Sequence, residues 1–422
     1  MGRGVIISLV IVLILLVVGL LVVVLSSGNE PTETPIVEGE GFKMGLVAEG
    51  PVSINPLNNL GTSIIRQNSW FTQRGTWVRT GLDVGVAYDN SLETLVTVEG
   101  IAHYTPKDYS SFKSNLRELI SGDKDIVKYW QLGNEPDLLW MMSGKTSDDY
   151  VEFFLELQPI IRDECPECKI VLAGISNQYD SGDNYEYFRD VLTKIKERSP
   201  DSKPFDVFDM HLYPFDDANY NMAERAVEEY KTLLQETGYD YPIELISTEF
   251  GMYSGQPKGF GEGLPFQTEE VQAQVLIKGM VQLFNGGLTK VSWSQLVNSY
   301  AYGHDNQNEG GIWDIIGLVY NGKGSYDLEN NIAEGTKKES YFAYKTLASK
   351  VVGKTQVDKI AKGVYKFYGD SEVVYVAWKE DSGRLPSEIS GEVKVTDHLG
   401  KEEVVDAESI ILDSNPIFIE MM

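Results

Sequence analysis

The chain has 422 residues and a formal net charge of -27. Hydrophobic residues make up 42% and charged residues 23%, which is typical of a folded globular protein and excludes a collagen-like or largely disordered chain. The acidic balance argues against a nucleic-acid partner, because most of the surface repels a phosphate backbone. The length suits one large domain of the barrel class with a smaller domain beside it.

Residues 1–26 are predicted to form an N-terminal transmembrane anchor. Val5 to Leu25 carry no charge, and at about 1.5 Å per residue they span roughly the 30 Å hydrocarbon core of a membrane. A cleaved signal peptide is the alternative, but its apolar region is shorter, about 7–15 residues, and ends at a small-residue cleavage site. Arg3 precedes the segment and no Lys or Arg follows before Lys43, so the positive-inside rule places the rest outside the cytoplasm.

Residues 27–41 are rich in Glu, Pro, Gly and Ser and predict a linker. From residue 42 to residue 350, short apolar runs alternate with longer segments that have one apolar face. The predicted strands are 42–48, 76–82, 93–100, 127–133, 169–175, 206–213, 243–250 and 289–296. Helical periodicity appears at 112–120, 150–161, 188–195 and 271–279, with Ser147 and Thr268 as candidate N-caps.

The alternation of strands and helices predicts an α/β fold with a parallel sheet buried on both faces. Eight such units in about 300 residues favour a (β/α)8 TIM barrel. An open dinucleotide-binding sheet is the less suitable alternative, because no GxGxxG turn follows the first strand.

Residues 351–422 have a different pattern of apolar residues. Short apolar runs at 364–369, 372–378, 391–397, 409–413 and 416–422 are separated by turn residues, with no long helix between them. This pattern predicts a small C-terminal antiparallel β domain of the sandwich-like kind.

The two cysteines, Cys165 and Cys168, lie in the sequence ECPEC. A structural zinc site needs four ligands, and no second CxxC or His pair accompanies this one. In an oxidising compartment we expect a local disulfide between them.

In a barrel of this class the active site lies at the carboxyl ends of the strands. Polar or aromatic residues that close the apolar runs are therefore the candidates. They are Arg79, His103, Asn134, Glu135, His211, Tyr213, Glu249 and Trp293.

Glu135 and Glu249 follow the fourth and seventh predicted strands. Two carboxyl groups at one barrel mouth suit acid/base chemistry, because their proximity keeps one protonated while the other is ionised. In retaining glycoside cleavage the two stand about 5–5.5 Å apart. Taken singly, Glu135 can also be a helix N-terminal carboxylate and Glu249 a salt-bridged strand end.

The sequences GNEP and TEFG, together with Arg79, the His-x-Tyr at 211–213 and Trp293, resemble the clan of retaining (β/α)8 glycoside hydrolases. In that clan the catalytic glutamates end strands four and seven. The resemblance implies that Glu135 is the general acid/base and Glu249 the nucleophile.

The resemblance also implies substrate-binding roles. Asn134 is expected to donate to the sugar 2-hydroxyl, Tyr213 to hydrogen-bond the nucleophile, and Arg79 to help keep it ionised. Trp293 is expected to form the floor of a sugar subsite, and His103 and His211 are further binding candidates. Three aromatic residues in loops are candidates for stacking on sugar rings: Trp140, Tyr253 and Trp313.

These features predict a membrane-anchored, extracellular, retaining β-glycoside hydrolase that acts on a carbohydrate, with endo action on a β-linked polysaccharide preferred. No cofactor and no metal are expected, and the oligomeric state is open. A metal-dependent barrel hydrolase is one alternative, but the four histidines form no HxH or HExxH motif. A glycan-binding barrel without catalysis is the other.

Overall fold

The computed structural model describes residues 41–47, 54–72, 76–100, 109–177, 182–200, 202–215, 220, 222–258, 262–299, 311–369, 372–381 and 383–422. The predicted anchor at residues 1–26, nearly all of the linker, and His103 lie outside these ranges. Within them, no helix combines the length and the apolar character that crossing a membrane requires.

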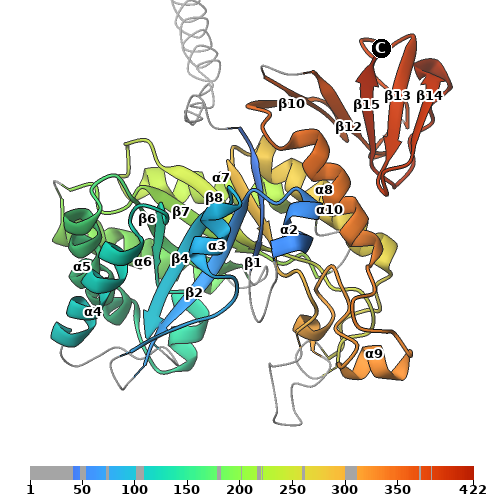
Figure 1. Ribbon diagram of the computed structural model, residues 1–422. Helices are drawn as coiled ribbons and strands as arrows, with labels where there is room; N and C mark the ends of the chain where they lie inside the picture. The colour runs from blue at the N-terminus through green and yellow to red at the C-terminus, as the bar shows by residue number, and fades with distance from the viewer. Residues whose placement is uncertain are drawn as a thin grey trace, which may run out of the picture. The chain divides into compact units, whose positions relative to one another are not determined.

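Eight parallel strands of the described chain form a closed barrel (Figure 1). They are β1 (Lys43–Val47), β2 (Ile64–Phe71), β4 (Glu93–Gly100), β5 (Tyr129–Leu132), β6 (Lys169–Asn177), β7 (Val207–Leu212), β8 (Glu244–Phe250) and β9 (Lys290–Trp293). β1 pairs with both β2 and β9, and this pairing closes the sheet. The predicted TIM barrel is confirmed.

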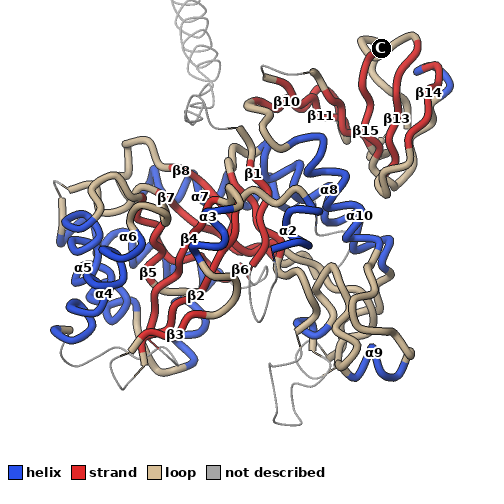
Figure 2. The backbone as a smooth tube through the Cα atoms, in the orientation of Figure 1, coloured by secondary structure: helices blue, strands red, loops and turns tan. Residues whose placement is uncertain are grey.

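Amphipathic helices lie outside the strands, and α4, α5 and α6 run side by side along one part of the sheet (Figure 2). The helices of the barrel are α2 (Ile54–Leu60), α3 (Val84–Asp89), α4 (Ser110–Asp123), α5 (Ser147–Glu164), α6 (Gly182–Arg198), α7 (Met222–Glu236), α8 (Glu269–Asn285), α9 (Ser325–Glu329) and α10 (Glu339–Val351). Thr268 caps α8 as predicted, since its side chain accepts from the Val271 N–H. For α5 the prediction was wrong by one residue, because Thr146 rather than Ser147 forms the capping box.

The assignment of residues 76–82 as the second strand of the barrel is wrong. Residues 77–79 form β3 (Trp77–Arg79), which pairs antiparallel with β2 and is not part of the closed barrel. The second barrel strand is β2, whose sequence IIRQNSWF carries four consecutive polar residues that are nevertheless buried. Local sequence therefore gave β2 the appearance of an exposed segment.

The barrel interior contains two layers of side chains. The first layer is apolar and consists of Ile64, Leu95, Tyr129, Val171, Val207 and Ile246. Successive inward-facing residues of a strand are two positions apart. Two residues further along five of these strands, the second layer is polar and buried, and it consists of Arg66, Thr97, Gln131, Asp209 and Thr248. This polar layer supports the carboxyl ends of the strands.

The C-terminal strands form one antiparallel sheet in the order β10-β11-β12-β15-β13-β14. They are β10 (Gln356–Ala361), β11 (Val364–Tyr368), β12 (Val374–Ala377), β13 (Glu392–Asp397), β14 (Glu402–Asp406) and β15 (Ile417–Met421). The predicted strand at 409–413 is absent from this described part of the chain, while β10 and β14 were not predicted. The ring of Phe367 packs on that of Phe42, and Asn415 accepts a hydrogen bond from Gln274 at 2.8 Å, so the sheet contacts the barrel. The limits 42–350 and 351–422 for the two parts stay predictions.

Cys165 and Cys168 are bonded, as predicted, with sulfurs 1.96 Å apart. The pair lies between α5 and β6, just before the first residue of the strand. It is therefore at the amino end of β6, away from the end at which the polar layer lies.

Candidate active site

Glu249 lies near the carboxyl end of β8. The Arg66 guanidinium donates to its Oε1 in a salt bridge, and the Tyr213 hydroxyl donates to its Oε2. Burial alone raises the pKa of a carboxyl, but the neighbouring positive charges outweigh it and hold the pKa of Glu249 below its usual range. These charges belong to His211 and Arg66. Glu249 is thus stabilised as a carboxylate.

Arg66, on β2, connects three parts of the site. Its Nη1 contacts Glu249, its Nε donates to Thr97 Oγ1 at 2.9 Å, and its Nη2 donates to Asn134 Oδ1 at 2.5 Å. Because the Asn134 oxygen accepts from Arg66, the amide nitrogen of Asn134 remains as the donor for a ligand. The sequence prediction missed Arg66, since β2 was not recognised as a strand.

Glu135 follows β5 at the start of a short π-helical turn, Pro136–Trp140. Its backbone is left-handed, with φ 41° and ψ 56°, a conformation that costs a non-glycine residue on the order of 1–2 kcal/mol. Asp137 fixes this turn to β6, because its carboxyl accepts from the Ser176 N–H at 3.1 Å and the Ser176 hydroxyl at 2.9 Å. The turn therefore holds Glu135 against the neighbouring strand.

The electrostatics of Glu135 are opposite to those of Glu249. Burial raises the pKa of Glu135, and the negative charge of Glu249 raises it further, against the lowering effect of the hydrogen bond with His211. The side chains of the two glutamates are 12% and 11% exposed, so both remain accessible to a ligand. Glu135 favours the protonated form and Glu249 the ionised form.

One oxygen of Glu135, one oxygen of Glu249 and a ring nitrogen of His211 all lie within 4.8 Å of one another. Such a trio can ligate a metal ion in principle. Here the Arg66 guanidinium already contacts Glu249, which makes it the cation partner of this carboxylate. The close spacing of the carboxyl groups suits a pair that shares one proton.

His211 lies on β7 between the carboxylates. Its Nδ1 is 2.7 Å from Glu135 Oε1 and 3.5 Å from Glu249 Oε2, and its Nε2 is 3.2 Å from Asp209 Oδ2. Burial lowers the pKa of an imidazole, but the surrounding carboxylates prevail and raise the pKa of His211 to about 10. His211 is therefore a charged donor in this site, and the structure brings it together with Asn134, Glu135, Tyr213 and Glu249.

Arg79 does not belong to this cluster, so the role predicted for it is wrong. It lies on β3 and forms a salt bridge with Asp123 at the end of α4. Arg66, rather than Arg79, lies beside Glu249. His103, another predicted binding residue, lies outside the described residues.

The prediction that Trp293 forms the floor of a sugar subsite is also wrong. Trp293 is completely buried, packs edge-on against Phe250, and donates its indole N–H to the Ile316 carbonyl at 3.2 Å. Phe250 in turn lies against Gly279 of α8, so both rings are on the outer, helix-facing side of the sheet. The next residue, Ser294, has the inward orientation and hydrogen-bonds with Tyr213.

Of the three aromatic candidates for stacking, Trp140 and Tyr253 are buried and are unavailable to a ligand. Trp313 is half-buried, in a short 3-10 turn (Ile312–Asp314), and meets the Tyr213 ring edge to face at 5.1 Å. It is thus the candidate that lies next to the two carboxylates through Tyr213.

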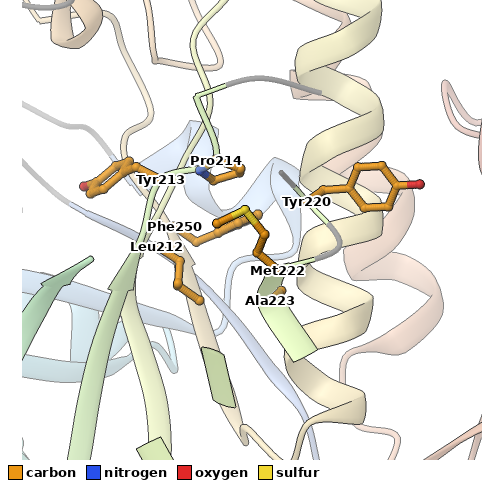
Figure 3. Close-up of a pocket in the computed structure, with 7 residues that line it drawn as sticks. All are labelled: Leu212, Tyr213, Pro214, Tyr220, Met222, Ala223 and Phe250. Atoms are coloured by element: carbon orange, nitrogen blue, oxygen red, sulfur yellow. The ribbon is translucent and has the colours of Figure 1, made fainter. Parts of the chain in front are cut away.

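A small pocket adjoins the site behind Tyr213. Figure 3 shows Leu212, Met222 and Phe250 pointing toward one another between the end of β7 and the start of α7, whereas the Tyr213 ring points away from them. No charged residue lines this pocket. It is an apolar hollow that supports Tyr213, and it does not contain the carboxylates.

Comparison with solved structures shows that this fold is that of (β/α)8 glycoside hydrolases. A family 39 glycoside hydrolase from Bacteroides cellulosilyticus is 15% identical, covers 91% of this chain and 81% of its own, and has a TM-score of 0.63. A family 39 β-xylosidase from Caulobacter crescentus is 14% identical, with 92% and 98% covered and a TM-score of 0.57. An α-L-arabinofuranosidase from Thermotoga maritima is 11% identical, with 92% and 97% covered and a TM-score of 0.56.

No family model matches the chain. No curated protein matches it in sequence either. At identities of 11–15% the structural similarity establishes the fold, so the chemistry must be argued from the residues of the site.

Proposed function

We propose that the protein is a retaining β-glycoside hydrolase in which Glu249 is the nucleophile and Glu135 the general acid/base. The observation that carries this proposal is the distance of at most 4.8 Å between an oxygen of Glu135 and an oxygen of Glu249. Retaining enzymes hold their carboxyl groups about 5–5.5 Å apart, whereas inverting enzymes leave about 6.5–9.5 Å for a water molecule.

The first step follows from the protonation states. The Glu249 carboxylate attacks the anomeric carbon, the bond from this carbon to the leaving oxygen breaks, and the Glu135 proton passes to that oxygen. In the second step the Glu135 carboxylate removes a proton from water. The resulting oxygen attacks the anomeric carbon and releases Glu249, which restores both side chains.

The substrate contacts proposed from the site involve the neighbours of these glutamates. Asn134 donates its amide N–H to the sugar 2-hydroxyl, since its oxygen is held by Arg66. Trp313 offers a half-exposed aromatic face beside Tyr213 for a sugar ring. Trp140 and Tyr253 are buried. Of the three predicted stacking residues, Trp313 is therefore the one that supports endo action on a β-linked polysaccharide.

The test is a screen of polymeric β-glycans and aryl β-glycosides with the parent and the Glu249→Gln variant. We expect hydrolysis of at least one substrate by the parent, loss of about a thousandfold or more in the variant, and retention of anomeric configuration by NMR. Glu334→Gln is the matched control, because Glu334 is an exposed glutamate with 70% of its side chain accessible.

Each outcome of the screen decides a part of the proposal. Inversion, or full activity of Glu249→Gln, would contradict the mechanism. Binding of a glycan without turnover on any substrate would favour a binding protein. Early products of several sugar units support endo action, whereas monosaccharide as the sole early product contradicts it.

We also propose that residues 1–26 anchor the enzyme in a membrane with the barrel outside the cytoplasm. This rests on the uncharged run from Val5 to Leu25 and on Arg3 before it. The full chain should remain in the membrane fraction after carbonate extraction, and external protease should digest the barrel of intact cells. Release by carbonate or protection from external protease would contradict this localisation.

A further inference from the structure

A third acidic residue lies behind the proposed catalytic pair. Asp209 is on β7, two residues before His211, and is completely buried. Its carboxylate accepts hydrogen bonds from Gln131 Nε2 at 2.5 Å, from the Thr248 N–H at 2.8 Å and from Thr248 Oγ1 at 2.6 Å. Its fourth partner is His211 Nε2 at 3.2 Å. A buried carboxylate with this many donors is a fixed acceptor.

We propose that Asp209 is a positioning residue that acts through His211, holding the imidazole as a doubly donating cation whose Nδ1–H is fixed on Glu135. The inference rests on the function proposed above and deepens it. It concerns how Glu135 is oriented and how its protonation state is kept different from that of Glu249. No proton moves from His211 to substrate.

The hydrogen-bond geometry supports this role. Both ring nitrogens of His211 face carboxylate oxygens, Nε2 toward Asp209 and Nδ1 toward Glu135. Nε2 is also 3.1 Å from Thr248 Oγ1, which donates its own hydrogen to Asp209 and can therefore only accept from the ring. A neutral imidazole has one N–H and can donate to only one of them, whereas the imidazolium donates to both. Since the Nδ1–H engages Glu135 Oε1, the second oxygen, Oε2, is left to carry the proton for the leaving group.

The neighbouring strand leaves room for this arrangement. A Cβ atom on Gly174 of β6 would lie 2.2 Å from His211 Nε2 and 2.7 Å from Asp209 Oδ2. Any side chain at position 174 would therefore collide with the hydrogen bond between the two residues. Gly174 keeps the space into which the imidazole and carboxylate fit.

The titratable groups around His211 come from β7, β8 and β2 and from residues just after β5 and β7. They are Asp209 on β7, Tyr213 after it, Glu249 on β8, Arg66 on β2 and Glu135 after β5. β6 contributes only Gly174 to this contact. Asp209 has a lowered pKa, since the His211 charge and its hydrogen bonds outweigh the raising effect of burial. The two opposite charges of Asp209 and His211 therefore cancel within the site.

Replacing Asp209 by a neutral residue should shift the pH profile of the enzyme in a predictable direction. In Asp209→Asn, His211 loses the partner of Nε2 and becomes neutral at lower pH. At a pH where His211 is neutral, Glu135 loses the positive charge on its hydrogen-bond partner, which raises the pKa of Glu135. The basic limb of the pH profile of kcat/KM should therefore shift to higher pH by about one unit.

The experiment measures the His211 charge directly, without need of turnover. The full chain in detergent is labelled with ¹⁵N-histidine, and the His211 signal among the four histidines is assigned by its loss in His211→Gln. We expect an imidazolium at pH 8 in the parent and a neutral ring at pH 8 in Asp209→Asn. Gln131→Met is the matched control, because it removes one donor to Asp209 and keeps the Asp209 charge.

A neutral His211 at pH 8 in the parent, or a charged one in folded Asp209→Asn, overturns the inference. If Asp209→Asn does not fold, Asp209→Ser removes the charge with a smaller side chain and is judged by the same spectrum. Hydrolysis with an unshifted pH profile in the neutral variant also overturns it. A charged His211 that depends on Asp209 in a protein without hydrolase activity would refute the proposed function and leave the charge relationship intact.

Discussion

Two adjacent layers of side chains fill the same barrel, and they have opposite character. Along β8, Ile246 belongs to the apolar layer and Thr248, two residues later, to the polar one. On β7 the same step leads from Val207 to Asp209, and on β2 from Ile64 to Arg66. The apolar layer stabilises by burial, whereas the polar layer stays folded only because its charges are paired. The residues that stabilise the barrel by burial and those that support the proposed active site are thus only two positions apart along the same strands.

The largest effect that separates the two layers is expected from Glu135→Ala. Removal of the acid/base should lower kcat/KM by about 10²–10⁴ for substrates with poor leaving groups and much less for activated aryl glycosides. Azide should then accelerate the second step and yield a glycosyl azide with the β configuration. Equal losses for all leaving groups would contradict the assignment, as would an azide product of inverted configuration. The free energy of unfolding serves as the control for folding.

A comparison of two arginines tests the polar layer itself. Arg66→Met removes the cation beside Glu249, so kcat/KM should fall about a hundredfold or more, and the acidic limb should move to higher pH because the pKa of Glu249 rises. Arg79→Met is the matched control. It breaks only the salt bridge to Asp123, which is partly exposed and worth about 1 kcal/mol or less. Similar kinetic losses in both variants would refute the assignment of Arg66.

A substitution in the apolar layer should have the reverse outcome. Ile246→Ala deletes buried methyl groups and should lower the free energy of unfolding by about 2–5 kcal/mol, because a cavity remains. Because the Ile246 side chain makes no hydrogen bond to the proposed catalytic groups, kcat/KM of the folded variant should change less than about threefold. Urea denaturation and assays at 25 °C measure the two quantities. A catalytic loss with unchanged stability would show that the layers are not separate.

The strands that carry the glutamates were predictable, because each is an apolar run that ends in a polar motif. β5 is followed by GNEP, and β8 closes on TEF, so their place at the barrel mouth follows from the barrel rule. β2 was not predictable in this way. Its buried Arg66 is stabilised by Thr97, Asn134 and Glu249, which come from other parts of the chain. Such partners cannot be read from local periodicity.

Side-chain direction was the second limit. Trp293 and Ser294 are adjacent, and in a strand neighbouring side chains point to opposite faces. Trp293 was predicted to bind the sugar because it is aromatic, but it faces the helices, whereas Ser294 contacts Tyr213. Asp209 was missed for a related reason. A single Asp within an apolar strand gives no local sign of the four donors that it binds.

The smallest effect is expected at the amino end of β6. The polar layer lies toward the opposite, carboxyl ends of the strands. Replacing Cys165 and Cys168 by serine opens a very short loop, so the chain-entropy term lost is only about 2 kcal/mol. Both cysteines are buried, and serine adds a modest cost of desolvating its hydroxyl groups. Urea denaturation should show this loss of stability, while the pH profile of kcat/KM and the NMR signal of His211 stay as in the parent. A shifted profile would mean that the two ends of the barrel are coupled, and that the polar layer is not held by its own hydrogen bonds alone.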